Sequence, residues 1–150
     1  MTERNLIVHR KSPASVASIW AVLADFPHLA KVWDGLKASE AIGGKTTGVG
    51  ARRRVRLSPV GTMVETVTAW EERHAIATMN EPSALVPFKH AESRLVLEPE
   101  GAGTAMTFHY RYVPRGGPLG KVTGPAIDRM LTATFTSMLA AVDKAAGREG

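Results

Sequence analysis

With 150 residues, of which 44% are hydrophobic and 22% charged, the chain has the length and composition of one globular domain, residues 1–150. It contains no cysteine, which excludes disulfides, thiolate catalysis and cysteine-ligated zinc and indicates a reducing compartment. The first residues lack the apolar core of a signal peptide, and no apolar run approaches the roughly 18 residues that span a bilayer, so we expect a cytoplasmic protein without membrane insertion. The net charge of +5 leaves an anionic partner open.

The N-terminal part predicts a strand followed by helical segments. Residues Asn5–Lys11 alternate between apolar and polar side chains, as a strand does. Ser12 is placed as a helix N-cap with proline after it, and apolar residues then recur at helical spacing, which predicts an amphipathic helix over Pro13–Ala24. Pro27 ends this pattern, because the residue before a proline disfavours the α region. His28–Trp33 is long enough for a second short helix.

From residue 49 the hydrophobic period changes to two, which predicts a region of strands. Glycines between residues 43 and 50 mark turns before it. Ser58–Gly61 is a tight turn and Glu81–Pro87 a longer loop with two prolines. The predicted strands are Val49–Leu57, Thr62–Trp70, His74–Asn80, Ala91–Leu97 and Thr104–Val113.

The C-terminal part predicts one long amphipathic helix after a flexible hinge at Arg115–Pro118. Gly124-Pro125 lies early in this helix and should kink or restart it. We expect about six strands between the first helix and the single late helix. When their sheet curls around the late helix, the two bury each other's apolar faces, and this arrangement leaves a cavity between them. The apolar stripe of the helix consists of Ile127, Leu131, Phe135, Met138 and Val142.

The last predicted strand carries its large apolar residues on one face, which should turn inward. Met106, Phe108, Tyr110 and Tyr112 form this face. The two tyrosine hydroxyls then need hydrogen-bond partners or water in a cavity, because a buried unpaired hydroxyl is costly.

Two charged residues fall on apolar faces of neighbouring predicted strands. Arg53 alternates with the apolar residues of 51–57, and Glu65 with those of 63–69. The short turn between the strands brings the two charges side by side, and a buried charge is costly unless it is paired. We therefore expect either a structural ion pair or a polar anchor that orients a ligand oxygen in an apolar pocket. In a rival register Trp70 and the threonines before it face inward, and Glu65 lies in solvent.

The sequence has no standard catalytic or cofactor-binding motif. It lacks a nucleophile elbow, a phosphate loop and a dinucleotide fingerprint, and its five histidines lack metal-ligand spacing, so we expect no metal and no cofactor. Arg52, Arg54 and Arg56 share one strand face, which is either a solvated outer face or a surface for an anionic partner. Without a basic helix or an aromatic stacking platform, no nucleic-acid partner is expected.

Several segments together resemble a known superfamily. They are Ser18–Phe26, Trp33, Gly48–Arg53, Val64–Val67 and Gly103-Thr104. They resemble the SRPBCC superfamily of START proteins, polyketide cyclases and birch-pollen allergens, and its bacterial polyketide cyclase/dehydrase-like branch in particular. The resemblance implies an α+β helix-grip fold, in which a seven-stranded curved antiparallel sheet and two short helices surround a long C-terminal helix and enclose a hydrophobic cavity. Members bind lipids, sterols, hormones or polyketides, and some are aromatase/cyclases.

By analogy with the plant abscisic acid receptors of this superfamily, Ser58–Gly61 matches a gate loop and Glu81–Phe88 a latch-like loop. Arg53 and Glu65 match an inward arginine and a pocket glutamate of those receptors. At two positions where the receptors hold a pocket lysine and an acidic pocket residue, this chain has Trp33 and Phe108. These departures argue against recognition of a hormone-type carboxylate.

The leading functional hypothesis is an intracellular protein, monomeric or homodimeric, that binds a small hydrophobic molecule such as a lipid or polyketide. An alternative is a polyketide cyclase, aromatase or dehydratase, in which Glu65 is a general base, Arg53 stabilises an enolate and Tyr110 donates a proton. A further alternative is a protein-interaction module that uses the basic strand face. The candidate ligand-binding residues are Trp33, Arg53, Val55, Leu57, Glu65, Phe108, Tyr110, Ile127, Met130, Leu131, Phe135 and Met138.

Overall fold

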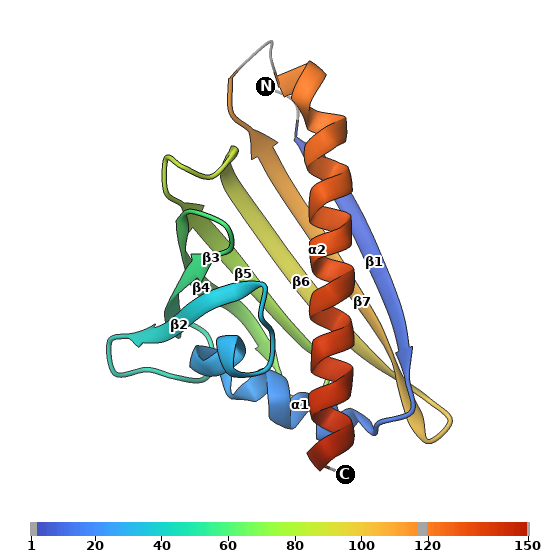
Figure 1. Cartoon of the computed structure of the whole chain (residues 1–150). Helices are drawn as coiled ribbons and strands as arrows, with labels where there is room; N and C mark the ends of the chain where they lie inside the picture. Colours follow the sequence, from blue (N-terminus) through green and yellow to red (C-terminus); the bar gives the residue numbers. More distant parts are fainter. Residues whose placement is uncertain (1–2, 117–119, 150) are drawn as a thin grey trace.

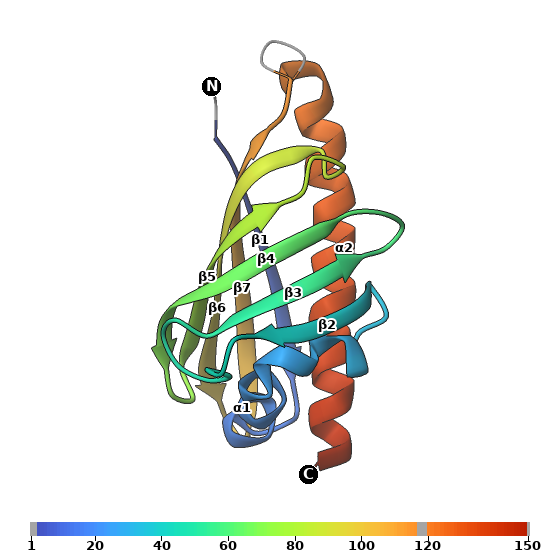
Figure 2. The same cartoon turned by 90° about the vertical axis from the view of Figure 1, so that its left-hand side faces the viewer.

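The computed structural model of the chain describes residues 3–116 and 120–149. Its elements are β1 (Arg4–Ser12), α1 (Val16–Ala24), η1 (Phe26–Lys31), β2 (Leu36–Ile42), β3 (Arg52–Leu57), β4 (Thr62–Glu71), β5 (Ala75–Pro82), β6 (Phe88–Glu100), β7 (Gly103–Pro114) and α2 (Gly120–Glu149). The described strands form one antiparallel sheet in the order β1-β7-β6-β5-β4-β3-β2. The sheet curls around one face of α2, and α1 and η1 lie near the C-terminal half of that helix (Figure 1, Figure 2). This is the expected helix-grip fold.

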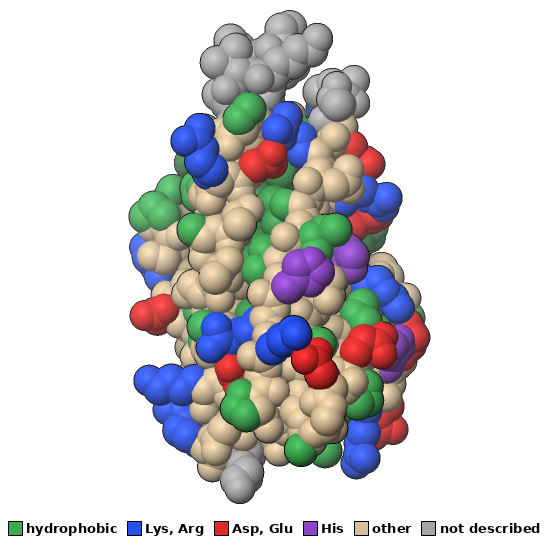
Figure 3. All heavy atoms as spheres, turned by 90° about the vertical axis from the view of Figure 1, so that its right-hand side faces the viewer, with side chains coloured by type: hydrophobic (Ala, Val, Ile, Leu, Met, Phe, Trp, Pro, Cys, Tyr) green, Lys and Arg blue, Asp and Glu red, His purple; other side chains and the backbone are tan. Residues whose placement is uncertain are grey.

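The long helix α2 is fixed to the neighbouring strands by buried and half-buried polar contacts at two levels. Arg4 on β1 donates to Asp128 at 2.6 Å, and the hydroxyl of Tyr112 on β7 donates to the same carboxylate at 2.6 Å. The Arg4 guanidinium, and then the Tyr112 hydroxyl, hold the pKa of Asp128 below its usual range. Four turns further along, Arg10 donates to Asp143 at 2.8 Å. On the face over β1 and α2, basic and acidic side chains are accordingly interspersed (Figure 3).

The first helix begins later than its sequence predicts. Ser15 is the N-cap, and its side chain accepts from the amide of Ser18 at 3.1 Å. Ser12, the predicted cap, instead ends β1, where its hydroxyl donates to Asp143 and accepts from the Ala14 amide at 3.0 Å. Ser12 therefore connects the strand to α2, and the prediction of a helix from residue 13 is wrong by one turn.

A β-bulge in β4 reconciles the two registers that the sequence leaves open. Glu65 and Val67 point inward, with 9% and 1% of their surfaces exposed, whereas Thr68 is exposed. The pairing with β5 slips between residues 67 and 69. Beyond the slip Trp70 turns inward and packs edge-on against Trp20, with 5.3 Å between ring centroids. The first register therefore holds through Val67, and of the rival register only the inward Trp70 is confirmed.

Three further predictions differ from the structure. β2 was not predicted as a strand, and β3 begins at Arg52 rather than Val49, which is 56% exposed. The helix α2 runs without interruption through Pro125, where a kink or restart was predicted. Of the predicted hinge, residues 117 and 118 lie outside the described residues. No helix in the described ranges is long and apolar enough to cross a bilayer.

Candidate functional site

A cavity of about 360 Å³ lies between the inner face of the sheet and the middle of α2. Residues from η1, from strands β2 to β7 and from the two loops after β3 and β5 complete its wall, and most of the lining is apolar. Ten candidate binding residues line it: Trp33, Arg53, Leu57, Glu65, Phe108, Tyr110, Met130, Leu131, Phe135 and Met138.

Two candidate residues do not line this cavity. Val55 is 1% exposed and lies on β3, where η1 packs against the strand. Ile127 is 7% exposed and lies one turn closer to the start of α2 than Leu131. Both belong to the packed core around the cavity. Strand and helix periodicity correctly predicted that they are buried, but periodicity does not tell whether a buried residue borders the cavity.

An aromatic cluster forms the wall between β7 and α2. Phe108 and Tyr110 follow each other on the inner face of β7, and their ring centroids lie 4.7 and 4.5 Å from that of Phe135 on α2. The alternation predicted for β7 is confirmed, since all four of its large inward residues are buried. On the other side of the cavity, the indole of Trp33 donates to the hydroxyl of Ser137 at 3.2 Å, which fixes the ring against α2.

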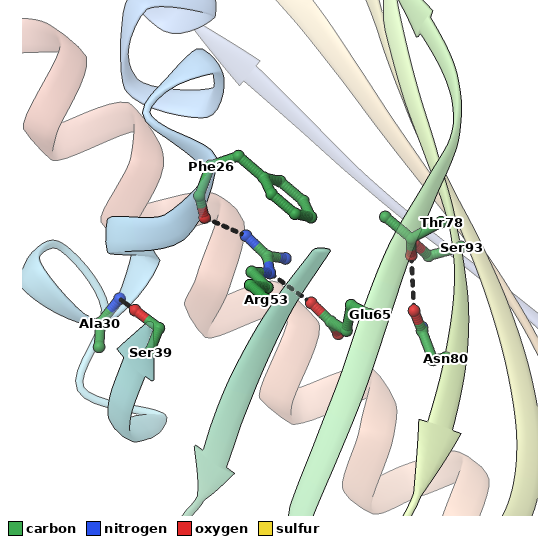
Figure 4. A network of polar contacts seen from close by, with 8 residues as sticks. All are labelled: Phe26, Ala30, Ser39, Arg53, Glu65, Thr78, Asn80 and Ser93. Carbon is green, nitrogen blue, oxygen red and sulfur yellow. Dashed lines mark hydrogen bonds and ion pairs between the residues drawn. The ribbon is translucent and has the colours of Figure 1, made fainter. Parts of the chain in front are cut away.

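Arg53 and Glu65, which both line the cavity, form the predicted ion pair (Figure 4). They are directly opposite on β3 and β4, and the Arg53 Nε lies 2.5 Å from the Glu65 Oε1. Each side chain is only 12% exposed. The guanidinium also donates to the Phe26 carbonyl at 2.8 Å and lies 3.9 Å from the centre of the Phe26 ring. The arginine is therefore held in place and its charge is balanced within the protein.

A second group of polar side chains on β5 and β6 lies on the strands next to this pair, and sequence reasoning missed it. The Thr78 hydroxyl donates to Asn80 Oδ1 at 2.7 Å, and its oxygen lies 2.5 Å from the Ser93 hydroxyl (Figure 4). Because Thr78 has a single hydroxyl hydrogen, Ser93 donates to Thr78. Asn80 and Ser93 both line the cavity. The available signal was the one that revealed Arg53, namely a polar residue at an inward position of a strand.

Two polar groups at the cavity wall have no hydrogen-bond partner within residues 3–116 and 120–149. They are the Tyr110 hydroxyl and the Asn80 Nδ2, in residues that are 3% and 0% exposed. Burial raises the pKa of Tyr110 strongly, and the negative charge of Glu65 raises it further, whereas the Asn80 amide acts in the opposite direction. The hydroxyl is therefore a stable neutral donor at any ordinary pH.

The opening of the cavity has an apolar rim. Val60, Leu85 and Met130 line the cavity, yet 54%, 69% and 48% of their surfaces are exposed. They come from the loop after β3, the loop after β5 and the outer side of α2. Large apolar side chains on three separate elements thus meet around one opening, where an apolar molecule would enter.

The loop after β5 is tied to its surroundings through Arg115. The guanidinium donates to the carbonyls of Val86 and Ser83 at 2.8 and 3.1 Å. The same loop reaches β4 through Ser83, whose amide donates to the Thr62 carbonyl at 2.8 Å. Arg115 was predicted to be part of a flexible hinge, but it is half-buried and connects the end of β7 to this loop.

Other features of the described residues are less suited to a site. A chamber of about 50 Å³ also borders Arg53, and a hollow of about 490 Å³ on the outer sheet face has mixed, partly charged walls. No cluster of three or more His, Asp or Glu residues in the described ranges could hold a metal ion. Arg52, Arg54 and Arg56 are exposed on the outer face of β3, which agrees equally with a solvated face and with a surface for an anionic partner.

Comparisons with known proteins agree on the fold. A family model described as "Polyketide cyclase / dehydrase and lipid transport" matches residues 6–147. Protein TTHA0849 from Thermus thermophilus is 16% identical with a TM-score of 0.83, and the alignment covers 98% of this chain and 99% of that one. A START superfamily protein from Mycobacterium smegmatis is 16% identical with a TM-score of 0.80, and the alignment covers 97% of this chain and 99% of that one. Ara h 8.0201 is 12% identical with a TM-score of 0.72, and the alignment covers 97% of this chain and 98% of that one. No curated protein matches the sequence.

Proposed function

The chain belongs to the polyketide cyclase/dehydrase and lipid transport family, and on that premise we propose that it binds a small hydrophobic molecule in the cavity between the sheet and α2. The observation that carries the proposal is the cavity itself, whose volume falls within the roughly 300–1,000 Å³ that is usual for ligand pockets. Its wall is mostly apolar, and transfer of apolar ligand surface from water contributes about 25 cal/mol per Å² before ordering costs.

The polar part of the wall supports binding over catalysis. Glu65 as a general base would first have to leave its ion pair with Arg53. Tyr110 as a general acid would be weakened by its raised pKa. Cyclase, aromatase or dehydratase chemistry by these three residues stays a prediction from the sequence, and so does a protein-interaction role of the basic face of β3.

A probe titration with a cavity-blocking variant tests the proposal. Thr134 lines the cavity, and among the described residues its hydroxyl bonds only to the Met130 carbonyl of its own helix, so Thr134→Trp fills the cavity at small local cost. We expect the neutral probe N-phenyl-1-naphthylamine to bind the wild type saturably, and the variant to bind it at least about tenfold more weakly, because the indole occupies the binding volume. The enhancement of probe fluorescence on binding measures the affinity of the wild type and that of the variant.

Thr132→Trp is the matched control, since Thr132 lies on the exposed side of the same helix. Its affinity for the probe should equal that of the wild type. Equal affinity in the wild type and in Thr134→Trp would place the probe outside the cavity and count against the proposal. Failure of the wild type to bind the probe saturably would refute it.

A further inference from the structure

We propose that the ligand of the cavity is uncharged and carries an acceptor oxygen, such as that of a ketone, an ester or an alcohol, which receives hydrogen bonds from the Tyr110 hydroxyl and the Asn80 amide. This inference rests on the proposed binding function and adds the chemical class of the ligand to it.

The first step is that both groups need a partner that the described residues do not supply. The Tyr110 hydroxyl and the Asn80 Nδ2 are fully buried and unpaired, and both residues line the cavity. A buried polar group without a hydrogen bond costs free energy, and nearly all such groups in native proteins are satisfied by protein, water or ligand. Whatever fills the cavity beside them can therefore gain hydrogen bonds that the protein has left open.

The second step concerns the direction of these hydrogen bonds. Asn80 Oδ1 is already occupied by the Thr78 hydroxyl, so the amide presents Nδ2, which only donates. Glu65 is directly opposite Asn80 on the neighbouring strand, and its negative charge favours this orientation of the amide dipole. Tyr110 is close enough to Asn80 and Glu65 for both to influence its hydroxyl. Asn80 Nδ2 can only donate, and the Tyr110 hydroxyl has its hydrogen free to donate, so a single ligand atom that satisfies both groups is an acceptor.

The third step concerns charge. Arg53 and Glu65 are the only charged residues in the described lining, and they neutralise each other. A ligand carboxylate would lie near Glu65 and find no free cation in the described lining, because the Arg53 guanidinium is already bound to Glu65 and to the Phe26 carbonyl. An uncharged oxygen avoids this repulsion and the cost of burying an unpaired charge.

Three probes with one ring system test the inference. They are 2-ethylnaphthalene, 2-acetylnaphthalene and 2-naphthoate, which differ in having no acceptor, a neutral acceptor or a charged one. Their affinities are measured by displacement of N-phenyl-1-naphthylamine from the wild type and from Tyr110→Phe. We expect the ratio of ketone affinity to hydrocarbon affinity to fall about 3- to 10-fold in the variant, which is the worth of one neutral hydrogen bond. Naphthoate should bind most weakly of the three.

Tyr112→Phe is the matched control. Tyr112 is the next inward residue of β7, but its hydroxyl is bound to Asp128 and it does not line the cavity. The variant should lose stability and keep the wild-type affinity ratio. Asn80→Leu provides an independent second variant, because Thr78 can donate to Ser93 instead, and it should also lower the ratio.

The outcomes separate this inference from the function on which it rests. If the hydrocarbon binds but the ratio is the same in the wild type, Tyr110→Phe and Asn80→Leu, the acceptor assignment is overturned while the binding function stands. If naphthoate binds more tightly than the ketone, the uncharged assignment is overturned. If none of the three probes displaces the bound dye, the inference falls, whereas the binding function falls only if the dye itself does not bind the wild type saturably.

Discussion

The two charged residues of the cavity were predictable from the sequence because their chemistry conflicts with their position. Arg53 and Glu65 stand out because each places a charge at an inward strand position, where burial is costly unless the charge is paired. Asn80 and Ser93 were missed because a neutral polar residue at an inward strand position is a weaker signal than a charge, which costs more free energy to bury. The unpaired donors followed only from three-dimensional placement, since no sequence pattern tells which buried hydroxyl finds a partner. Tyr112 finds one on α2 and Tyr110 does not.

At this scale we predict that Glu65→Leu destabilises the protein by about 3–5 kcal/mol, because it leaves the Arg53 charge buried and unpaired. The double variant Arg53→Met/Glu65→Leu removes both charges and should recover most of this loss. Urea unfolding measures both free energies. Glu71→Leu breaks the exposed pair with Arg94 and serves as the control with a much smaller effect. A double variant no more stable than Glu65→Leu would contradict the prediction.

Among the elements, those with a one-sided apolar pattern were predictable and the edge strand was not. β7 and α2 each bury one regular face, so their period is visible in the sequence. β2 lies at the edge of the sheet, and only Leu36 of its residues is fully buried. Its irregular pairing with β3 after Leu36 further disturbs the alternation. An exposed, bulged edge strand therefore has no periodic apolar signal to detect.

At the scale of elements we predict that Arg115→Met loosens the loop after β5. The change removes two hydrogen bonds from a charged donor to the Val86 and Ser83 carbonyls. Hydrogen exchange of the Val86 amide should become about tenfold faster, and the naphthylamine probe should dissociate faster, because this loop forms part of the rim. Arg111→Met is the control, since Arg111 lies on the outer face of β7 in contact with Glu92. Unchanged exchange at Val86 would show that other contacts hold the loop.

At the scale of the whole molecule the cavity is assembled from parts distant in the chain. η1, β3, β4, β7 and α2 contribute to one wall, so the unfolded chain has no binding site. The sequence resemblance predicted this architecture correctly, because the order of strands and a late helix is visible without knowing any contact. It could not predict the volume of the cavity, which depends on how closely many side chains approach one another.

We therefore predict that a saturating ligand raises the thermal midpoint of the entire protein. At a free probe concentration of 100 Kd the stabilisation is about 2.7 kcal/mol, which corresponds to roughly 5–10 °C for a chain of this size. Differential scanning calorimetry with and without N-phenyl-1-naphthylamine measures the shift. Thr134→Trp should show a much smaller shift at the same probe concentration. An equal shift in that variant would mean that the probe stabilises the fold from another surface.

The bulge at Thr68 shifts the inward and outward alternation of side chains along β4 by one residue. On one side of it Glu65 faces the cavity, and on the other Trp70 packs on Trp20. Loss of this single residue by deletion would rotate one half of the strand relative to the other and exchange its inward and outward residues. Such a deletion would change the cavity wall at Glu65 while Trp70 keeps its contact with Trp20. Strict alternation from Trp70 back along the strand would place Glu65 on the outer face, which is wrong. The residues before and after position 68 therefore have to be aligned separately when this strand is compared with that of another protein.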